Sequence, residues 1–426
     1  MAVKMMPQAS QINAYLRKHQ LAPLQIRAAP DPQLGAVVVI PSRDEPQVTR
    51  TLASLSACRP PGVGVEVLLV VNGAADADLG ERARNARSAA LARDFAASAR
   101  CPPGLRIQVL EYPDLAPREA GVGLARRLGM DEALARLGRV GRADAPIIGL
   151  DADCRVADNY LVAIVDHFRQ QPRIKACSIY FEHPLDGDLA PPVYRAIGEY
   201  ELYLRYFRLG LARAGYPFAH HTLGSCMAVR ASAYRASGGM NRRQGAEDFH
   251  FLSKLMLLGG FSDLNTTRVY PGARPSQRVP FGTGQAVARR LRETSLLVCA
   301  PEVFDAIAAL VQAVSGWAQQ AAVNLDPGVE AYFQARGLTA RLAEVRRETA
   351  SVRAFEKRLY RWLNPLCMVK FANYLSAGRY PRIPVAEAAG RLLEGGARAG
   401  PRPVLKLLRR YRKLEQMGSQ MGSVPV

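Results

Sequence analysis

Cysteines are few in this 426-residue sequence: there are seven, and none stands in a CxxC spacing. That absence argues against a zinc ribbon or a disulfide framework, and it favours a reducing compartment. The first twenty residues lack the apolar core of a signal peptide. The longest stretch without charge, 306–325, contains four amide side chains, so we expect a buried helix there and no membrane span.

The glycine-rich loops of two common nucleotide-binding folds are also missing. Neither GxGxxG nor GxxxxGK[ST] follows the first apolar run, Ala36–Ile40, which ends instead in Pro41-Ser-Arg-Asp-Glu45. A nicotinamide-dependent enzyme and a P-loop ATPase are therefore disfavoured.

Acidic residues are scarce relative to basic ones. Asp and Glu number 37 against 57 Lys and Arg, which gives a net charge of +20, and residues 331–426 hold +13 of it. An excess of this sign favours acidic partners, such as nucleotide phosphates, nucleic acid or an anionic membrane surface. Because the charge is concentrated in the last quarter and no reader motif is recognisable, we expect no specific nucleic-acid target.

What the sequence does contain is an alternation of strand and helix patterns. Four apolar runs predict strands buried on both faces of a sheet: 36–40, 65–71, 105–110 and 146–150. Helical patterns separate them at about 47–57, 79–99 and 122–137. This order predicts an α/β fold with a doubly wound, mostly parallel sheet, in which ligands bind beyond the carboxyl ends of the strands.

The chain is predicted to have four parts. Residues 1–33 form an N-terminal arm that packs on the fold, 34–284 the sheet domain, 285–417 a basic helical appendage and 418–426 a flexible tail. Within the helical part, 404–414 combines an apolar stripe with five bases. Such a helix either lies on an anionic membrane surface or docks on its own protein, and the sequence leaves both open.

Two acidic pairs stand where a cleft is expected. Asp151 and Asp153 follow the fourth strand directly, and hard oxygen ligands of this kind suit Mg²⁺ or Mn²⁺, which would in turn hold a diphosphate. Glu247 and Asp248 open an apolar helix after a glycine-rich stretch, where a carboxylate can act as a general base. The alternatives are a solvated turn for the first pair and a complement to the helix dipole for the second.

Taken in order, these motifs resemble the family 2 glycosyltransferases of the GT-A fold. The resemblance covers about 36–265 and is carried by VIPSRDE at 39–45, LVVNG at 69–73, Ala125-Arg126, LDAD at 150–153 and GAED at 245–248. It implies a metal-dependent, inverting transfer of a sugar, expected to be a hexose, from a nucleotide-sugar to a hydroxyl acceptor. A UDP-sugar is the expected donor.

The resemblance also implies roles for individual residues. Asp248 would be the base, with Glu247 as its neighbour or substitute, and Asp153 would be the firmer metal ligand beside Asp151. The expected contacts to the donor nucleotide are Pro41, Arg43, Glu45, Asn72, Arg126 and Asp151, and further candidates for the diphosphate are Arg274 and Arg278.

The sequence departs from the family pattern in the first two loops. Arg43 and Asp44 stand where an aromatic residue and an Asn usually precede the Glu, and Asn72 stands where an Asp is common. These departures motivate one alternative, an inactive glycosyltransferase-like scaffold, and the net charge motivates another, a basic nucleic-acid-binding protein. We expect a cytoplasmic protein, peripheral at the inner face of the membrane if the basic helix binds there.

Overall fold

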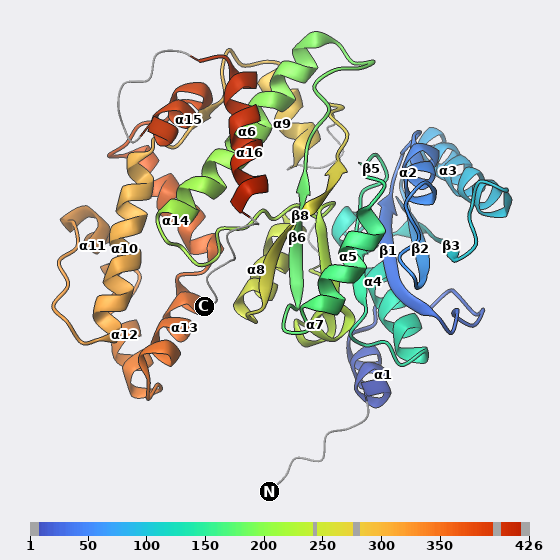
Figure 1. Cartoon of the computed structure of the whole chain (residues 1–426), viewed down its shortest axis with the longest axis horizontal. Coiled ribbons are helices and arrows are strands. Elements are labelled where there is room, and N and C mark those ends of the chain that lie inside the picture. The colour runs from blue at the N-terminus through green and yellow to red at the C-terminus, as the bar shows by residue number, and fades with distance from the viewer. Residues whose placement is uncertain (1–7, 242–244, 276–281, 395–401, 419–426) are drawn as a thin grey trace, which may run out of the picture. The chain divides into compact units, whose positions relative to one another are not determined.

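The structure, a computed structural model, describes residues 8–241, 245–275, 282–394 and 402–418. It divides into two compact units, whose elements are labelled in Figure 1. The first unit contains 1–194 and 222–288, and the second contains 195–221 and 289–418. The sequence placed 195–221 with the sheet, whereas the structure places it with the helices; a division into separately folding domains stays a prediction.

The first unit is built on one mixed sheet with the strand order β3-β2-β1-β4-β7-β6-β8-β5. The half from β3 to β4 is parallel, whereas β7 runs antiparallel to both of its neighbours. Beyond it, β6 and β8 pair in parallel and β5 is antiparallel to β8. The strands are β1 (Leu34–Ser42), β2 (Gly64–Ala74), β3 (Leu105–Leu115), β4 (Pro146–Gly149), β5 (Arg155–Val156), β6 (Ala176–Phe181), β7 (Met227–Arg230) and β8 (Phe261–Tyr270). The predicted α/β class with a mostly parallel sheet is confirmed.

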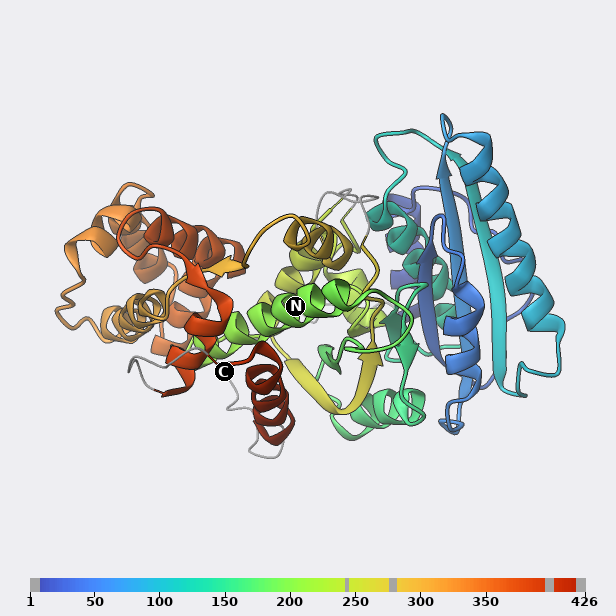
Figure 2. The same cartoon turned by 90° about the horizontal axis from the view of Figure 1, so that it is seen from above.

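Helices cover both faces of the parallel half of the sheet. Figure 2 shows α2 (Val48–Ser56) and α3 (Leu79–Ala97) on one side of β1–β3 and α4 (Val122–Arg139) on the other. Right-handed crossovers require this, because the chain moves outward from β1 to β3 and then returns to β4. The remaining helices of this unit are α1 (Gln8–His19), α5 (Tyr160–Gln170), α7 (Ala231–Ala236), α8 (Glu247–Leu257) and most of α9 (Thr283–Arg290).

The helix α4 is buried along most of its length and carries charge inside the fold. Fifteen consecutive residues, 123–137, are buried, and five of them are charged: Arg126, Arg127, Asp131, Glu132 and Arg136. Each has a charged or backbone partner, as an unpaired buried charge would be costly. The arm helix α1 packs on α4 and buries Ile12, Tyr15 and Leu16, so the arm does pack on the fold.

The second unit is helical. It contains most of α6 (Pro191–Arg213), then α10 (Glu302–Ala318), α11 (Pro327–Gln334), α12 (Leu338–Arg347), α13 (Val352–Trp362), α14 (Pro365–Ala377), α15 (Val385–Glu394) and α16 (Val404–Gly418). A small antiparallel pair, β9 (Leu297–Val298) and β10 (Ile383–Pro384), accompanies them. Among the residues described, no helix is both long and apolar enough to cross a membrane, and that includes α10 in the uncharged stretch.

The apolar stripe of α16 is covered by the second unit itself. Leu407, Leu408 and Tyr411 are buried, and the Tyr411 hydroxyl donates to the carbonyl of Ala389 at 3.0 Å. Of the predicted stripe, Leu414 is the member that remains exposed. The stripe therefore docks on its own protein, which was the second of the two expectations. Four of its five bases stay exposed: Lys406, Arg409, Arg410 and Lys413.

Candidate active site

The loops that the sequence singled out meet at one edge of the sheet. The strands β1, β2 and β4 are parallel, so their carboxyl ends lie together, with Ser42 opposite Val71 and Asn72 one residue further on. Asp151 and Asp153 follow β4 at this edge. Because β7 is antiparallel to β4, the segment just before β7 arrives at the same place.

Arg126, near the start of α4, joins the two acidic pairs. Its guanidinium is 3% exposed and donates from Nη1 to Glu247 Oε1 and from Nη2 to Asp151 Oδ1. The third nitrogen, Nε, has no hydrogen-bond partner within the part of the chain that the structure describes. One side chain thus connects the acids after β4 to the acids at the start of α8.

Glycines make the space for this arrangement. A Cβ on Gly224, just before β7, would lie 2.4 Å from Arg126 Cζ, and one on Gly149 would lie 2.6 Å from the Gly224 carbonyl oxygen. A Cβ on Gly272, after β8, would lie 2.6 Å from Asp153 Oδ2. Real Cβ atoms do not approach other atoms so closely, so each of these positions depends on having no side chain.

Asp248 is held by two backbone donors. Its Oδ2 accepts from the N–H of Gly224 at 2.9 Å, and its Oδ1 accepts from the N–H of Phe249 at 2.7 Å. The residue before α8, Ala246, is in the left-handed region with φ of 56°, and its own side chain makes no capping hydrogen bond. The N–H of Phe249 is satisfied by Asp248 instead, and the helix dipole favours the two acids in the first turn.

The acids at this edge share one nearby guanidinium. Burial raises the pKa of Glu247 to about 7, with Arg126 opposing the shift and the charge of Asp248 adding to it. Burial also raises the pKa of Asp248, against Arg126 and the two backbone donors. Since like charges held close together cannot all ionise easily, the pair at the start of α8 retains a proton to unusually high pH.

Asp151 and Asp153 are the candidates for holding a metal ion. Both are half-buried, and Asp151 shares its Oδ1 with Arg126. Over the described ranges no group of three or more His, Cys, Asp and Glu side chains could surround an ion. Two carboxylates fit a hard divalent ion whose other ligands are phosphate oxygens and water, and they do not fit an ion held by protein alone.

The other predicted donor contacts are mostly engaged with protein groups. Arg43 donates to Glu81 at 2.8 Å and to the carbonyl of Ala120, and Pro41 lies within β1. Glu45 is 3% exposed and accepts from Arg274 at 2.6 Å. This ion pair therefore joins the loop after β1 to the segment after β8, and each of them holds a residue that was predicted to contact the donor. Arg278 lies outside the residues that the structure describes.

Asn72 and Ser42 are buried polar residues at the ends of β2 and β1. Each is 2% exposed, and neither Asn72 Nδ2 nor Ser42 Oγ has a hydrogen-bond partner among the residues placed in the structure. Buried donors are rarely left this way, so these two atoms are candidates for binding a ligand.

Two residues of the site were not found in the sequence. Asn85 on α3 accepts from the N–H of Asp44 at 2.8 Å and donates to the carbonyl of Asn72 at 3.2 Å, so it ties the loop after β1 to the end of β2. Gly224 holds Asp248 and gives Arg126 its space. An amide in a charged helix and a glycine in a loop are both common, and no sequence pattern distinguished these two.

The comparisons with known proteins give one family match. Residues 147–299 match the model of "Glycosyl transferase family group 2". No curated protein matches the sequence. Among solved structures, S. aureus TarS 1–349 in complex with UDP-GlcNAc is 13% identical, with 68% of this chain and 76% of that one covered and a TM-score of 0.40. The same fragment in complex with UDP is 13% identical over 91% and 92%, with a TM-score of 0.38.

The family match includes both acidic pairs. Asp151 and Asp153 lie near its start, and Glu247 and Asp248 lie within its second half. The family resemblance that the sequence motifs indicated is confirmed over the segment 147–299, which matches the model of family group 2 and includes two of the five motifs, LDAD and GAED.

Proposed function

We propose that this glycosyltransferase moves a sugar from a nucleotide-sugar, with a UDP-sugar as the expected donor, to a hydroxyl acceptor with inversion at the anomeric carbon. The observation that carries the proposal is the position of Arg126, which joins Asp151 to Glu247 through one guanidinium. This contact links the acids proposed to bind the metal ion, Asp151 and Asp153, to the acids proposed to supply the base, Glu247 and Asp248.

In this proposal Asp248 accepts the proton of the attacking hydroxyl. Its two backbone hydrogen bonds fix the direction of the carboxylate, and a positioned base is worth roughly 10²–10⁴-fold in rate. Glu247 pairs with Arg126 and is the second candidate for the base. Arg126 was expected to contact the nucleotide, and we now propose that it positions the acids.

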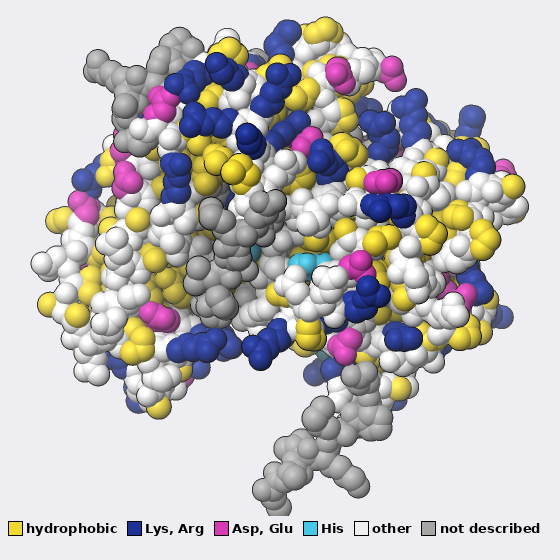
Figure 3. Space-filling view, in the orientation of Figure 1, with side chains coloured by type: hydrophobic (Ala, Val, Ile, Leu, Met, Phe, Trp, Pro, Cys, Tyr) yellow, Lys and Arg dark blue, Asp and Glu magenta, His cyan; other side chains and the backbone are white. Residues whose placement is uncertain are grey.

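On the donor side, Asp153 and Asp151 would hold Mg²⁺ or Mn²⁺ together with the diphosphate. When bound, such an ion supplies positive charge to a departing nucleoside diphosphate. Asn72 and Ser42 would bind the nucleotide from the ends of β2 and β1. The visible face in Figure 3 has more Lys and Arg than Asp and Glu side chains, which suits an anionic donor.

The proposed location in the cell follows from the proposed donor. We propose a cytoplasmic protein, as nucleotide-sugars of this class would be met there. The exposed bases of α16 would permit contact with an anionic membrane by charge alone, since its apolar stripe is covered.

The experiment that tests the proposed function is the substitution Asp248→Asn. A panel of nucleotide-sugars first identifies the donor from metal-dependent thermal stabilisation, because a bound ligand raises the melting temperature. The variant should keep its affinity for that donor in calorimetry and lose turnover by roughly 10²–10⁴-fold. Asp166→Asn, on α5, removes an acid that pairs with Arg169 three residues further along the same helix, and it is the matched control. Near-normal turnover in Asp248→Asn would remove the base assignment.

A further inference from the structure

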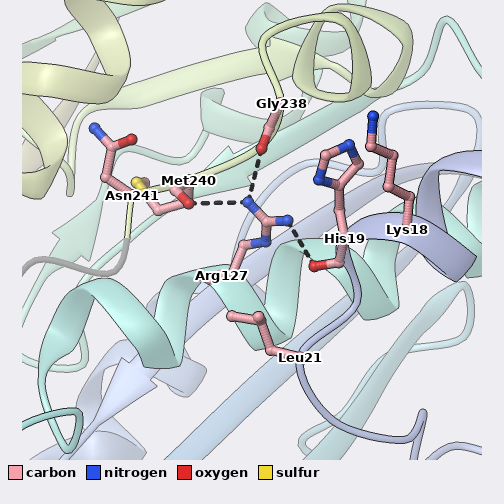
Figure 4. Close-up of a pocket in the computed structure, with 7 residues that line it drawn as sticks. All are labelled: Lys18, His19, Leu21, Arg127, Gly238, Met240 and Asn241. Atoms are coloured by element: carbon pink, nitrogen blue, oxygen red, sulfur yellow. Dashed lines mark hydrogen bonds between the residues drawn. The ribbon is translucent and has the colours of Figure 1, made fainter.

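Arg127 lies next to Arg126 on α4 and contacts a different set of groups. Its Nη1 donates to the carbonyls of Gly238 at 2.8 Å and Met240 at 3.0 Å, and its Nη2 donates to the carbonyl of His19 at 3.0 Å. Figure 4 shows this guanidinium between the end of α1 and the loop that follows α7. One side chain therefore ties the N-terminal arm to that loop.

The loop is held at three consecutive carbonyls. Between the two that Arg127 contacts, the carbonyl of Gly239 accepts from Lys254 Nζ of α8 at 2.7 Å. Gly238 and Gly239 have φ of +76° and +79°, and a Cβ on Gly239 would lie 2.2 Å from Tyr15 Oη and 2.3 Å from Arg127 Nη1. Lys254 thus ties α8 itself to the loop that Arg127 holds.

A buried carboxylate completes the connection to the arm. Arg127 Nε donates to Asp131 Oδ2 at 2.8 Å, and Asp131 Oδ1 accepts from Tyr15 of α1 at 3.2 Å and from Tyr234 of α7 at 2.7 Å. The arm and the loop also line a hollow of about 700 Å³, and Arg127 spans from one to the other inside it (Figure 4). The elements α1, α4 and α7 are therefore joined at this one point.

We propose that Arg127 is a positioning residue for the acids of α8: it ties the carbonyls of Gly238 and Met240 to α4 and to the arm, and the Gly239 carbonyl between them holds Lys254, so that Arg127 sets where α8 and its acids stand. This inference rests on the proposed function of those acids. The start of α8 needs such support, because Ala246 is in a left-handed conformation that persists only where the surroundings impose it. On this view α4 holds the acids twice, directly through Arg126 and indirectly through Arg127.

The chain offers a matched control at the other end of the same helix. Arg136 is also buried on α4, pairs with the buried Glu66 and donates to the carbonyl of Ala28 in the arm at 3.0 Å. These contacts join α4 to the arm and to β2, whereas the contacts of Arg127 include the carbonyls of Gly238 and Met240. Arg127→Gln and Arg136→Gln each remove one buried cation, so a general loss of stability should appear in both.

The test compares hydrogen exchange and kinetics in these two variants at a temperature where both are folded. We expect faster amide exchange over residues 247–253 in Arg127→Gln and wild-type exchange there in Arg136→Gln. We also expect kcat of Arg127→Gln to fall by on the order of 10²-fold, the effect of a small misplacement of a reacting group, with KM for the donor unchanged. If Arg127→Gln does not fold, Arg127→Lys and Arg136→Lys give the same comparison.

Two results would overturn the inference: wild-type exchange over 247–253 in Arg127→Gln, or an equal fall of kcat in both variants. Amide hydrogen exchange is measured without a nucleotide-sugar. It therefore tests the positioning of α8 by Arg127 independently of the proposed function. Faster exchange in Arg127→Gln, together with no transfer from any nucleotide-sugar by the wild type, would contradict the proposed function and leave the positioning of α8 by Arg127 intact.

Discussion

Two buried ion networks, one in each unit, have opposite compositions. Among the residues described, the network of the first unit has three carboxylates around one cation: Arg126, Asp151, Glu247 and Asp248. In the network of the second unit two carboxylates, Glu201 and Glu415, are bonded to three basic side chains, Arg205, Arg412 and His221, and the charge of Arg208 also acts on Glu415. Both include contacts between residues more than 100 positions apart in the sequence, and the two networks differ in charge balance.

The pKa values of the acids follow this balance. Burial raises the pKa of Glu247 to about 7, because one arginine does not compensate all the acids beside it. Burial also acts on Glu415, but there Arg205 and His221 prevail and lower its pKa to about 2. A network short of cations is suited to binding a cation or a proton, and a network with enough cations is suited to holding helices together.

The largest expected effect comes from removing the single arginine of the first network. Arg126→Met should lower the free energy of unfolding at pH 7 by about 3–5 kcal/mol, because it leaves buried carboxylates without a partner. Chemical denaturation measures this loss, and it should shrink at pH 5, where the acids can take up protons. Arg126→Lys, which keeps the charge, is the control. Equal stability of Arg126→Met and the wild type would show that the acids are already neutral.

A smaller loss is expected from the second network. Glu415→Gln should lower the stability of the second unit by about 3 kcal/mol, the worth of a carboxylate whose pKa lies well below its unfolded value. The variant should keep normal turnover per folded molecule, since these contacts hold helices. Glu330→Gln, an exposed acid on α11, should have little effect on either measurement. A fall in turnover with full stability would give Glu415 a role beyond holding α16.

The two networks should also respond to different ranges of pH. The folded pKa of Glu247 lies above its usual 4.5, so its contribution to stability is lost as pH rises from about 4.5 to about 7. The folded pKa of Glu415 lies below 4.5, so its contribution is complete above that value and is lost as pH falls toward about 2. Both tryptophans, Trp317 and Trp362, belong to the second unit, so their fluorescence reports on it selectively.

Fluorescence-detected denaturation should therefore show a second unit that is insensitive to pH between 7 and 5 and loses stability between 4 and 2. In Glu247→Gln, the change in stability of the whole protein between pH 5 and 7 should become smaller. Loss of the tryptophan signal already between pH 7 and 5 would contradict the assignment of the low pKa to Glu415.

The smallest effect on stability is expected at Asp153. Because Asp153 is half-buried in the loop after β4 and lies close in the chain to the acid Asp151, Asp153→Asn should change the free energy of unfolding by no more than about 0.5 kcal/mol. The same substitution should abolish the Mg²⁺-dependent part of UDP affinity, and Asp151→Asn should weaken that affinity less. Calorimetry with and without Mg²⁺ measures both. Metal-dependent affinity that survives in Asp153→Asn would show that the ion is held elsewhere.

The parallel half of the sheet could be predicted from the sequence because its signals are local. Each of the first four strands and the helices between them was placed within a few residues, since uninterrupted apolar runs mark buried parallel strands. The antiparallel strand β7 (Met227–Arg230) is different, as it is not among the four apolar runs that predicted strands. Its length depends on pairing with β4 and β6, and the residues of these two strands lie far from β7 in the sequence.

The candidate site was predicted in part, and for a similar reason. Acids directly after a buried strand stand out in the sequence, so Asp151 and Asp153 could be found. Arg126 and Arg127 lie in a helix whose many charges are typical of a solvent-exposed surface, and charged residues are seldom fully buried. Glu247, which Arg126 contacts, and Gly238, which Arg127 contacts, are more than 100 residues away in the chain, so no local pattern indicated these contacts, and the family resemblance implied a nucleotide contact for Arg126 instead.

The connection between α6 and α16 sets the order in which the second unit can form during synthesis. Arg205 emerges from the ribosome about 210 residues before its partner Glu415, and Glu201 emerges 211 residues before Arg412. At usual translation rates that interval is roughly 10–40 s. For that time the newly made α6 has no α16 to cover its charged face, while the strands of the first unit up to β8 are already available. The sheet of the first unit can therefore be assembled before the helices encoded after it.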